Sequence, residues 1–448
     1  MKLGDYIRQV PHASADEARV GVSEKERARL RELLYREIPS ERIAQLLAQG
    51  REQARRELAV SIEQILSAHD FAPMNDIDRS ALIEHTLDLV LGLGPIEKML
   101  KDDSITEIMV NGPRSVFFER DGIVCRSVER YDSEEQLRLV IDRIVSPLGR
   151  RVDEQSPIVN ARLPEGHRVN VVIPPLSLGG TSLTIRKFRA QSFTLDELVE
   201  LDALSPEMAQ LLAWAVRTRK NIAVSGGTGG GKTTLLNALS RLIPFEERVI
   251  TIEDSAELRF DQHPHVVRLE ARLANAEGRG AVTIRELVIN ALRMRPDRIV
   301  VGECRGAEAL DMLQAMNTGH DGSMTTLHAN SPAEVIPRLV MMVRYGMDLP
   351  TEIIEEQIAS ALDLVIQQDR LSGGKRRITQ IAMRDENDAD MTREHRRFVP
   401  VVRWDRRTQR YEWSELPAWI EDLPFMGMAS EQEVGQWVQS VHCCCSQA

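Results

Sequence analysis

A glycine-rich stretch near the middle of the chain has the residue types that phosphate binding requires. It runs from Gly226 to Thr234 and reads Gly-Gly-Thr-Gly-Gly-Gly-Lys-Thr-Thr. Glycines let successive backbone N–H groups turn toward phosphate oxygens, a conformation that side chains obstruct. An apolar run precedes the stretch at 221–224 and a helix-forming run follows at 235–239. Because strand, loop and helix in this order are the context of a P-loop, the stretch predicts binding of a nucleoside triphosphate.

Individual positions of this loop predict separate contacts with ATP and Mg²⁺. Lys232 is expected to reach the β- and γ-phosphates, and the Thr233 hydroxyl is expected to bind Mg²⁺. The N-terminus of the following helix adds partial positive charge. The predicted ATP-binding residues of the loop are Gly226, Gly227, Thr228, Gly229, Gly230, Gly231, Lys232, Thr233 and Thr234.

Two glutamates that follow apolar runs are candidates for water activation and Mg²⁺ binding. Glu303 comes after the run 299–301, and Gly302 stands where a usual Walker B sequence has Asp. Glu253 follows the run 249–252 and supplies a second carboxylate. Ligands bind at the carboxyl ends of parallel strands, so we predict that both glutamates are catalytic and bind Mg²⁺. The alternatives are a surface carboxylate at a strand end and a solvated acidic turn.

Two histidines, His320 and His328, lie within the segment 318–330. The pair brackets an expected strand that follows Glu303, so we interpret both as catalytic, either as a γ-phosphate sensor or as a hydrogen-bond relay. Zinc binding is the less favoured alternative, because no cluster of acids or cysteines has ligand spacing around them.

The P-loop region lacks an evident cation for the charge on the transferring phosphoryl group. Arg162, Arg168, Arg186 and Lys187 lie on or beside expected strands of the preceding region. Arginines delivered from another domain or subunit would couple hydrolysis to domain closure or assembly. The alternative is an exposed sheet face with solvated arginines.

Composition and charge narrow the class of protein. The chain has 448 residues, 42% of them hydrophobic and 28% charged, which is ordinary for a soluble protein of two or three domains. No run of 18 apolar residues occurs and the start lacks the apolar core of a signal peptide, so we expect a cytoplasmic protein, with docking on a membrane complex left open. The net charge of −11 does not favour broad nucleic-acid binding, and no nucleic-acid partner is expected.

The five cysteines do not form a disulfide framework. Three of them, Cys443 to Cys445, crowd the end of the chain. Acylation or metal binding would be possible functions for them, and a dangling tail is the favoured interpretation.

Changes in hydrophobic period divide the chain into segments. Strands alternating with helices predict an α/β P-loop domain with a parallel-rich, buried sheet, preceded by an α+β domain with a mostly antiparallel sheet. The predicted segments are a helical N-terminal module at 1–75, the α+β domain at 76–188, a linker at 189–204, the P-loop ATPase domain at 205–375, and C-terminal strands and a tail at 376–448.

Several motifs together resemble those of the secretion ATPases, which drive type II and type IV secretion and type IV pili. The acidic pair at 253–254, Glu303 and the histidine segment 318–330 carry this likeness. The CpaF-like branch, which serves tight-adherence (Flp-type) pili, is the more similar one. Its likeness rests on the segments 92–97, 108–113, 162–170, 173–176, 183–188, 301–306 and 315–320.

The resemblance implies a RecA-like ATPase domain in a homohexameric ring, with ATP bound between the N-terminal domain and that domain. Such rings associate peripherally with the cytoplasmic side of an inner-membrane platform protein and act indirectly on pilins or secreted substrates. The resemblance also implies phosphate contacts for Arg162, Arg168 and Arg186, within one subunit or across subunits. Asn160 departs from the family pattern, which has an acid there. The absence of a tetracysteine module argues against the classical type II and type IVa branches.

Three other functions compete with a pilus or type II-like secretion motor. The first is a type IV secretion traffic ATPase for DNA or effectors. The second is a nucleic-acid translocase, against which the acidic balance and the 4% aromatic content speak. The third is a regulatory scaffold without turnover, which the presence of Lys232, Thr233 and Glu303 disfavours.

Overall fold

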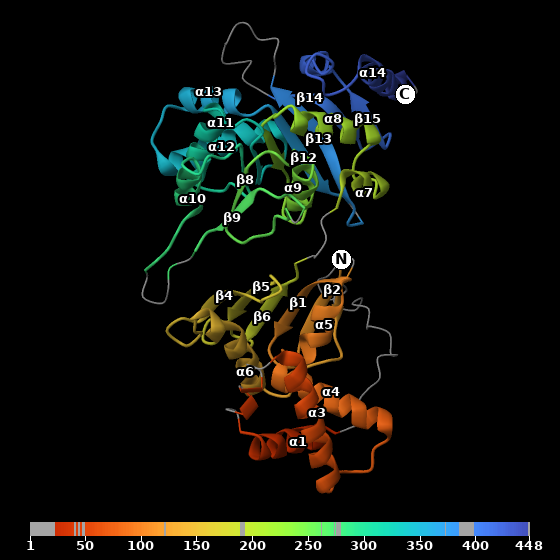
Figure 1. The fold of residues 1–448 in the computed structure, drawn as a ribbon, viewed down its shortest axis with the longest axis vertical. Helices are drawn as coiled ribbons and strands as arrows, with labels where there is room; N and C mark the ends of the chain where they lie inside the picture. Colours follow the sequence, from red (N-terminus) through yellow and green to blue (C-terminus); the bar gives the residue numbers. More distant parts are fainter. Residues whose placement is uncertain are drawn as a thin grey trace, which may run out of the picture. The chain divides into compact units, whose positions relative to one another are not determined.

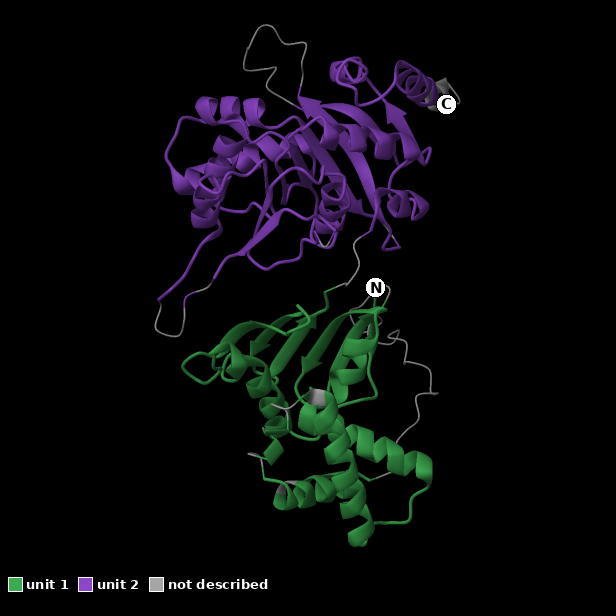
Figure 2. Ribbon diagram, viewed as in Figure 1, with its two compact units in different colours: residues 1–189 green, residues 190–448 purple. Residues whose placement is uncertain are grey.

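The computed structural model describes residues 23–39, 42–43, 45–46, 50–120, 122–188, 193–260, 262–272, 274, 279–371, 373–384 and 398–446. The chain forms two compact units, unit 1 at 1–189 and unit 2 at 190–448, coloured separately in Figure 2. Residues 1–22 of the predicted helical module and 189–192 of the predicted linker lie outside the described residues.

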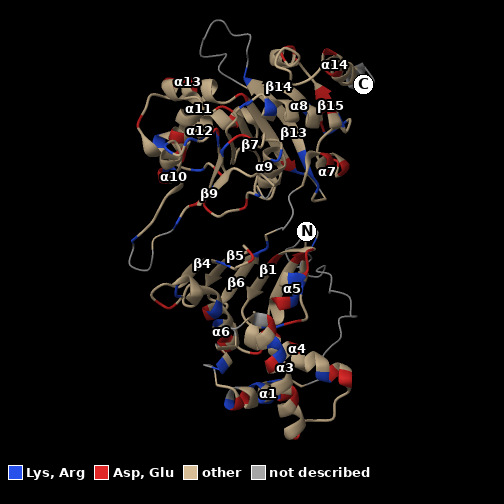
Figure 3. Cartoon of the chain, viewed as in Figure 1, with Lys and Arg blue, Asp and Glu red and all other residues tan. Residues whose placement is uncertain are grey.

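The described part of unit 1 includes the helices α1 (Glu24–Glu37), α3 (Arg51–Ala68) and α4 (Asp76–Leu91). A capping box starts α1, because the Ser23 side chain accepts from the Glu26 backbone while the Glu26 carboxylate accepts from Ser23. Lys, Arg, Asp and Glu are interspersed along these helices (Figure 3). Their apolar stripes meet in one buried cluster, which includes Leu30, Leu34, Leu58, Ile62 and Leu82.

A six-stranded antiparallel sheet forms the rest of unit 1 (Figure 1). Its strand order is β3-β2-β1-β6-β5-β4. Apolar residues of its strands pack with those of α6 in a second core. The bounds are α5 (Glu97–Lys101), β1 (Ile105–Asn111), β2 (Val116–Arg120), β3 (Ile123–Arg126), α6 (Glu134–Val145), β4 (Ile158–Arg162), β5 (Arg168–Val172) and β6 (Ser182–Arg186), with short 3-10 turns at Gly94–Ile96 and Ser146–Leu148.

Unit 2 is built on a nine-stranded sheet of order β15-β14-β13-β12-β7-β11-β10-β8-β9. The strands from β12 to β9 in this order are parallel, and β13, β14 and β15 add to β12 in antiparallel fashion. The bounds are β7 (Ile222–Ser225), β8 (Val249–Glu253), β9 (Val266–Glu270), β10 (Arg298–Val301), β11 (Met324–Leu327), β12 (Leu364–Arg370), β13 (Arg376–Arg384), β14 (Phe398–Asp405) and β15 (Arg410–Trp413).

Helices cover both faces of this sheet. Successive strand residues point to opposite faces, so Val224 joins one core and Ala223 joins the other. One face packs against α7 (Leu195–Glu200), α8 (Pro206–Arg217), α9 (Lys232–Ser240) and α14 (Glu431–Ser446). The other packs against α10 (Ile284–Ala291), α11 (Glu308–Asn317), α12 (Pro332–Gly346) and α13 (Thr351–Ala361). The α/β fold class with a parallel-rich sheet, preceded by an α+β domain and helices, is confirmed.

Two features of unit 2 differ from the expectations drawn from the sequence. The strand β9 was not predicted, because its five residues are only half-buried or exposed and lack a continuous apolar run. The dangling tail was a wrong prediction for residues 443–446, since their backbone continues α14 to Ser446. Within the described part of the chain, no helix is both long and apolar enough to cross a membrane.

Candidate nucleotide-binding site

The predicted catalytic segments gather at the carboxyl ends of four neighbouring parallel strands. The P-loop follows β7, and the pairing of Leu327 with Ser225 brings the residue after β11, His328, next to the start of this loop. Glu253 ends β8, and Glu303 follows β10, which lies between β8 and β11. Parallel strands present their carboxyl ends at one edge, which explains how residues far apart in the sequence share a site.

The P-loop adopts the conformation that its glycines permit. Gly231 is the N-cap of α9 and has φ 96°, a left-handed conformation that favours glycine. Thr228 is exposed in the loop, whereas Thr233 and Thr234 lie in the first turn of α9. This arrangement places backbone N–H groups and a helix N-terminus where an anion can bind.

The Lys232 side chain is folded back onto its own loop. Its Nζ donates hydrogen bonds to the carbonyl oxygens of Gly226 and Gly227, at 3.0 Å each. It also lies 3.4 Å from Nδ1 of His328. Lys232 is 8% exposed. A buried ammonium group therefore occupies the mouth of the loop, held by neutral acceptors that a phosphate oxygen can replace.

His328 connects this lysine with the predicted catalytic base. Nε2 of the His328 ring is 3.0 Å from Oε1 of Glu303. One tautomer satisfies both contacts, because Nδ1 then accepts from Lys232 while Nε2–H donates to Glu303. The three side chains thus form a continuous polar chain across the site, as the hydrogen-bond relay interpretation of His328 requires.

Glu253 is the most strongly perturbed carboxyl group of the site. Its Oε1 accepts hydrogen bonds from the backbone N–H groups of Glu257 and Leu258, at 2.6 and 2.9 Å. Its Oε2 is buried and has no hydrogen-bond partner in the described structure. Burial raises the pKa of Glu253 to about 7, against the lowering effect of those two hydrogen bonds.

Gly302 makes room for the Glu253 side chain. A Cβ atom at position 302 would lie 2.8 Å from Cγ and 3.3 Å from Oε1 of Glu253. The aspartate of a usual Walker B sequence is therefore sterically incompatible with Glu253 in this position. Glu253 occupies that space from the neighbouring strand, which supports its prediction as the substitute carboxylate.

The residues present fit a Mg²⁺ ion. Mg²⁺ takes oxygen ligands and uses one or two protein carboxylates together with water and phosphate oxygens. The unpartnered, buried Oε2 of Glu253 is such a ligand, and the raised pKa of this carboxyl shows that nearby protein cations do not offset its burial. Thr233 and Glu303 would be the other protein ligands of the ion. A metal site made of protein side chains alone is not indicated, because among the residues that the structure describes no three or more His, Cys, Asp or Glu are grouped to hold a metal.

His320 does not lie at this site. It precedes β11, whereas His328 follows it, so the two histidines lie beyond opposite ends of the strand. The His320 ring is 3.1 Å from the carbonyl oxygen of Ala315 in the last turn of α11. Grouping both histidines in one catalytic site is therefore not supported, because only the carboxyl end of a parallel strand faces the P-loop.

The predicted arginines form a row in unit 1. Arg168 pairs with Arg162 on one side and with Arg186 on the other, so the three follow one another across β4, β5 and β6. Directly opposite residues have Cβ atoms about 5 Å apart, so three cationic side chains leave the sheet from adjacent positions here. Lys187 instead donates to the carbonyl oxygens of Met99 and Asp102. Asn160, where the resemblance leads us to expect an acid, accepts a hydrogen bond from the Asn170 side chain.

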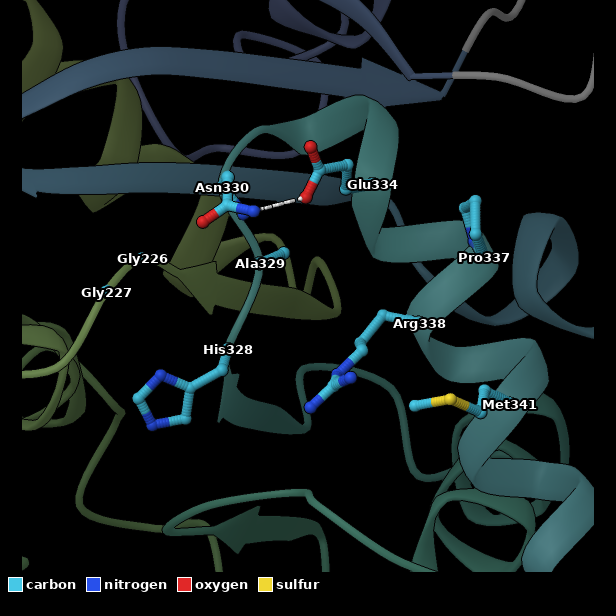
Figure 4. Close-up of a pocket in the computed structure, with 9 residues that line it drawn as sticks. All are labelled: Gly226, Gly227, His328, Ala329, Asn330, Glu334, Pro337, Arg338 and Met341. Atoms are coloured by element: carbon cyan, nitrogen blue, oxygen red, sulfur yellow. Dashed lines mark hydrogen bonds between the residues drawn. The ribbon is translucent and has the colours of Figure 1, made fainter.

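Two features beside the P-loop were not predicted. The first is Arg338 of α12, which lines a pocket together with Gly226, Gly227 and His328 (Figure 4). The second is the β12–β13 hairpin, where Nε of Arg376 donates to the carbonyl oxygen of Gly229 at 3.0 Å. Neither arginine belongs to a motif. The only sequence signal for Arg338 is the helical spacing of Glu334, Arg338 and Met341.

The P-loop, the parallel-rich sheet and the carboxyl groups and His328 at its carboxyl edge define a RecA-like P-loop protein. The family model of the type II/IV secretion system proteins matches residues 90–397, and the chain belongs to this family.

Two relatives and one solved structure match this chain over most of their own length. A protein of Mycobacterium tuberculosis that is named for conjugal transfer is 41% identical over 298 residues, which cover 65% of this chain and 84% of the relative. The type IV secretion system protein VirB11 of Bartonella henselae is 33% identical over 340 residues, which cover 67% of this chain and 94% of the relative. The solved VirB11 ATPase of Brucella suis is 32% identical, covers 65% of this chain and 96% of its own, and has a TM-score of 0.36.

Proposed function

We propose that this chain is a Mg²⁺-dependent ATPase motor that powers pilus assembly or type II-like protein secretion. In this proposal it forms a homohexameric ring at the cytoplasmic side of the inner membrane. It acts on a membrane platform protein, and through it on pilins or secreted substrates. The observation that carries the proposal is the polar chain from Lys232 through His328 to Glu303 at the mouth of the P-loop.

These side chains have the chemistry that ATP hydrolysis requires. Lys232 exchanges the carbonyls of Gly226 and Gly227 for phosphate oxygens. Glu303 accepts a proton from the attacking water, whose oxygen bonds to the γ-phosphorus while the bond to the ADP oxygen breaks. His328 holds the Glu303 carboxylate in place. Bound Mg²⁺ would neutralise phosphate charge, with Glu253, Glu303 and Thr233 as its protein ligands.

The arginine row is proposed to supply further positive charge to the phosphates. Arg162, Arg168 and Arg186 follow one another across three neighbouring strands, so their side chains start close enough together to contact one anionic ligand. Contacts from unit 1 would make hydrolysis depend on the placement of the two units, within one subunit or between neighbours.

Type IV secretion of DNA or effectors is the competing proposal. The names of the relatives favour it, because they include VirB11 proteins of type IV secretion systems and a protein named for conjugal transfer. The two functions share the same site chemistry, so only the transported substrate separates them.

Replacing Glu303 with Gln in the source cell separates these proposals. The amide retains the shape of the carboxylate but cannot accept the proton, so rings that contain the variant bind ATP and stall. Loss of one small, pilin-sized polymer from the sheared cell surface would support a pilus motor. Intact surface polymers with loss of effector export or DNA transfer would support type IV secretion instead. In purified protein, unchanged phosphate release after Glu303→Gln would contradict the ATPase proposal itself.

A further inference from the structure

We propose that Arg338 contacts the γ-phosphoryl group of ATP, and that the pocket beside it receives this group and the phosphate formed from it. Arg338 would then distinguish ATP from ADP, because only ATP extends into the pocket. This inference rests on the proposed ATPase function and assigns a cation within unit 2 itself.

The pocket lies directly beside the start of the P-loop. Its volume is about 420 Å³, which is ample for a phosphate group. In Figure 4 the Arg338 side chain extends from α12 toward the space that the His328 ring also borders. The lining residues are Gly226, Gly227, His328, Ala329, Asn330, Glu334, Pro337, Arg338 and Met341.

Arg338 is a cation without a partner in the described part of the structure. It is exposed, and among the described residues no hydrogen bond, ion pair or ring contact engages it. Glu334 lies one helical turn away, the spacing at which oppositely charged side chains pair. Its carboxylate instead accepts from the backbone and side-chain nitrogens of Asn330, at 3.2 and 2.8 Å. The guanidinium group thus remains available for an anion.

Lys232 adjoins the pocket through three of its lining residues. Its Nζ is bonded to the carbonyls of Gly226 and Gly227, the same two residues that line the pocket, and it contacts the His328 ring. A phosphoryl group bound by Lys232 therefore lies next to the pocket. Two cations, Lys232 and Arg338, then flank the group on which charge accumulates during transfer.

Secondary structure fixes the placement of Arg338. The helix α12 starts at Pro332, shortly after His328, so its first turns stay close to the carboxyl edge of β11. Glu334, Arg338 and Met341 follow one another at i, i+4 and i+7 and thus share one face of the helix.

The test compares Arg338→Ala and Arg338→Lys with Arg344→Ala and Lys232→Ala in the full-length protein. Arg344 is the matched control, because it lies on the same helix but outside the pocket and donates to the Leu349 carbonyl. We would measure dissociation constants for Mg·ADP and Mg·ATPγS, and kcat and KM from phosphate release. A charge-assisted hydrogen bond contributes about 1.5–3 kcal/mol, so Arg338→Ala should weaken ATPγS binding about 10- to 100-fold.

The expected pattern is selective. Arg338→Ala should leave ADP affinity within about twofold, reduce kcat about tenfold or more, and be partly rescued by Arg338→Lys. Arg344→Ala should match the wild type in every measurement. An unchanged ratio of ADP to ATPγS affinity in Arg338→Ala would overturn the inference, whether both affinities stay the same or both fall by the same factor. If the wild type and Lys232→Ala bind ATPγS equally, the proposed function fails rather than the role of Arg338.

Discussion

His328 and Glu303 are joined by a contact of 3.0 Å between Nε2 of the ring and Oε1 of the carboxylate. Neither residue is deeply buried, since their side chains are 38% and 31% exposed. The contact therefore contributes little to folding, and its significance lies in orientation. It directs one carboxylate oxygen of Glu303 toward the ring and fixes which ring nitrogen carries the proton.

Replacing His328 with Ala should reduce hydrolysis more than binding. Glu303 then loses the donor that orients it, while Lys232 keeps its two carbonyl contacts. We expect kcat to fall about 100-fold, the lower end for a group involved in acid–base catalysis, with ADP affinity within about threefold. Phosphate release and nucleotide titration measure the two effects.

His320→Ala provides the contrast, because His320 contacts α11 at the other end of β11. The structure predicts a loss of about 1 kcal/mol in the free energy of unfolding and little change in kcat of the folded protein. A large loss of kcat in His320→Ala with unchanged stability would restore the sequence-based view that both histidines serve one site.

Gly302→Ala should disable the site through Glu253. The new Cβ would lie 2.8 Å from Cγ of Glu253, closer than two carbon atoms approach, so the carboxylate must move away from its backbone donors. We expect a stability loss of about 1–3 kcal/mol, typical of overpacking, and a kcat at least about tenfold lower. Thermal unfolding and phosphate release measure these changes.

The double variant Gly302→Ala with Glu253→Ala is the matched control. Removing the Glu253 side chain relieves the clash, so stability should recover toward that of Glu253→Ala while activity stays low. Strictly additive stability losses would show that the two residues do not compete for the same space.

Site residues could be predicted from the sequence where they belong to a short local motif at the end of an expected parallel strand. The P-loop, Glu253 and Glu303 each follow an apolar run, and parallel strands bring such ends together. Arg338 was not predictable, since an exposed arginine on an amphipathic helix resembles any solvated residue. Its role depends on a pocket formed with P-loop residues that are distant in the sequence.

The strands of the fold likewise divide into those that could be predicted from the sequence and those that could not. The strongly apolar strands β7, β8, β10 and β11 were expected, because burial on both faces requires continuous apolar runs. The edge strand β9 needs no such run, since its pairing with β8 consists of backbone hydrogen bonds. The separation of His320 from His328 was already implied by the expected strand between them, because only the carboxyl end of a parallel strand faces the P-loop.

The stability of the nucleotide-free protein should decrease as pH rises between about 4.5 and 7. The ordinary pKa of a glutamate carboxyl is 4.5, whereas that of Glu253 is about 7 in the folded protein, because burial disfavours its charged form. Between these values the folded state binds more protons than the unfolded state, so raising the pH favours unfolding. The contribution is fully present below pH 4.5 and is lost by pH 7, and it amounts to about 3 kcal/mol.

Urea unfolding in EDTA at a series of pH values measures this slope, with Glu253→Gln as the control. The amide does not titrate, so the variant should lack the decrease while keeping the other pH dependences of the chain. Parallel pH profiles for the two proteins would exclude a raised pKa for Glu253.

Arg376→Ala should loosen the P-loop from the side of the β12–β13 hairpin. The guanidinium group donates to the Gly229 carbonyl at 3.0 Å, and the Gln368 backbone packs directly against Gly226 and Gly230. Losing one exposed hydrogen bond from a charged donor costs about 1 kcal/mol, so nucleotide affinity should fall about fivefold with kcat nearly unchanged. Lys375→Ala removes a neighbouring exposed charge without this contact and serves as the control. Equal affinity losses in both variants would assign the effect to charge alone, whereas a loss confined to Arg376→Ala identifies the hairpin as a support of the phosphate-binding loop.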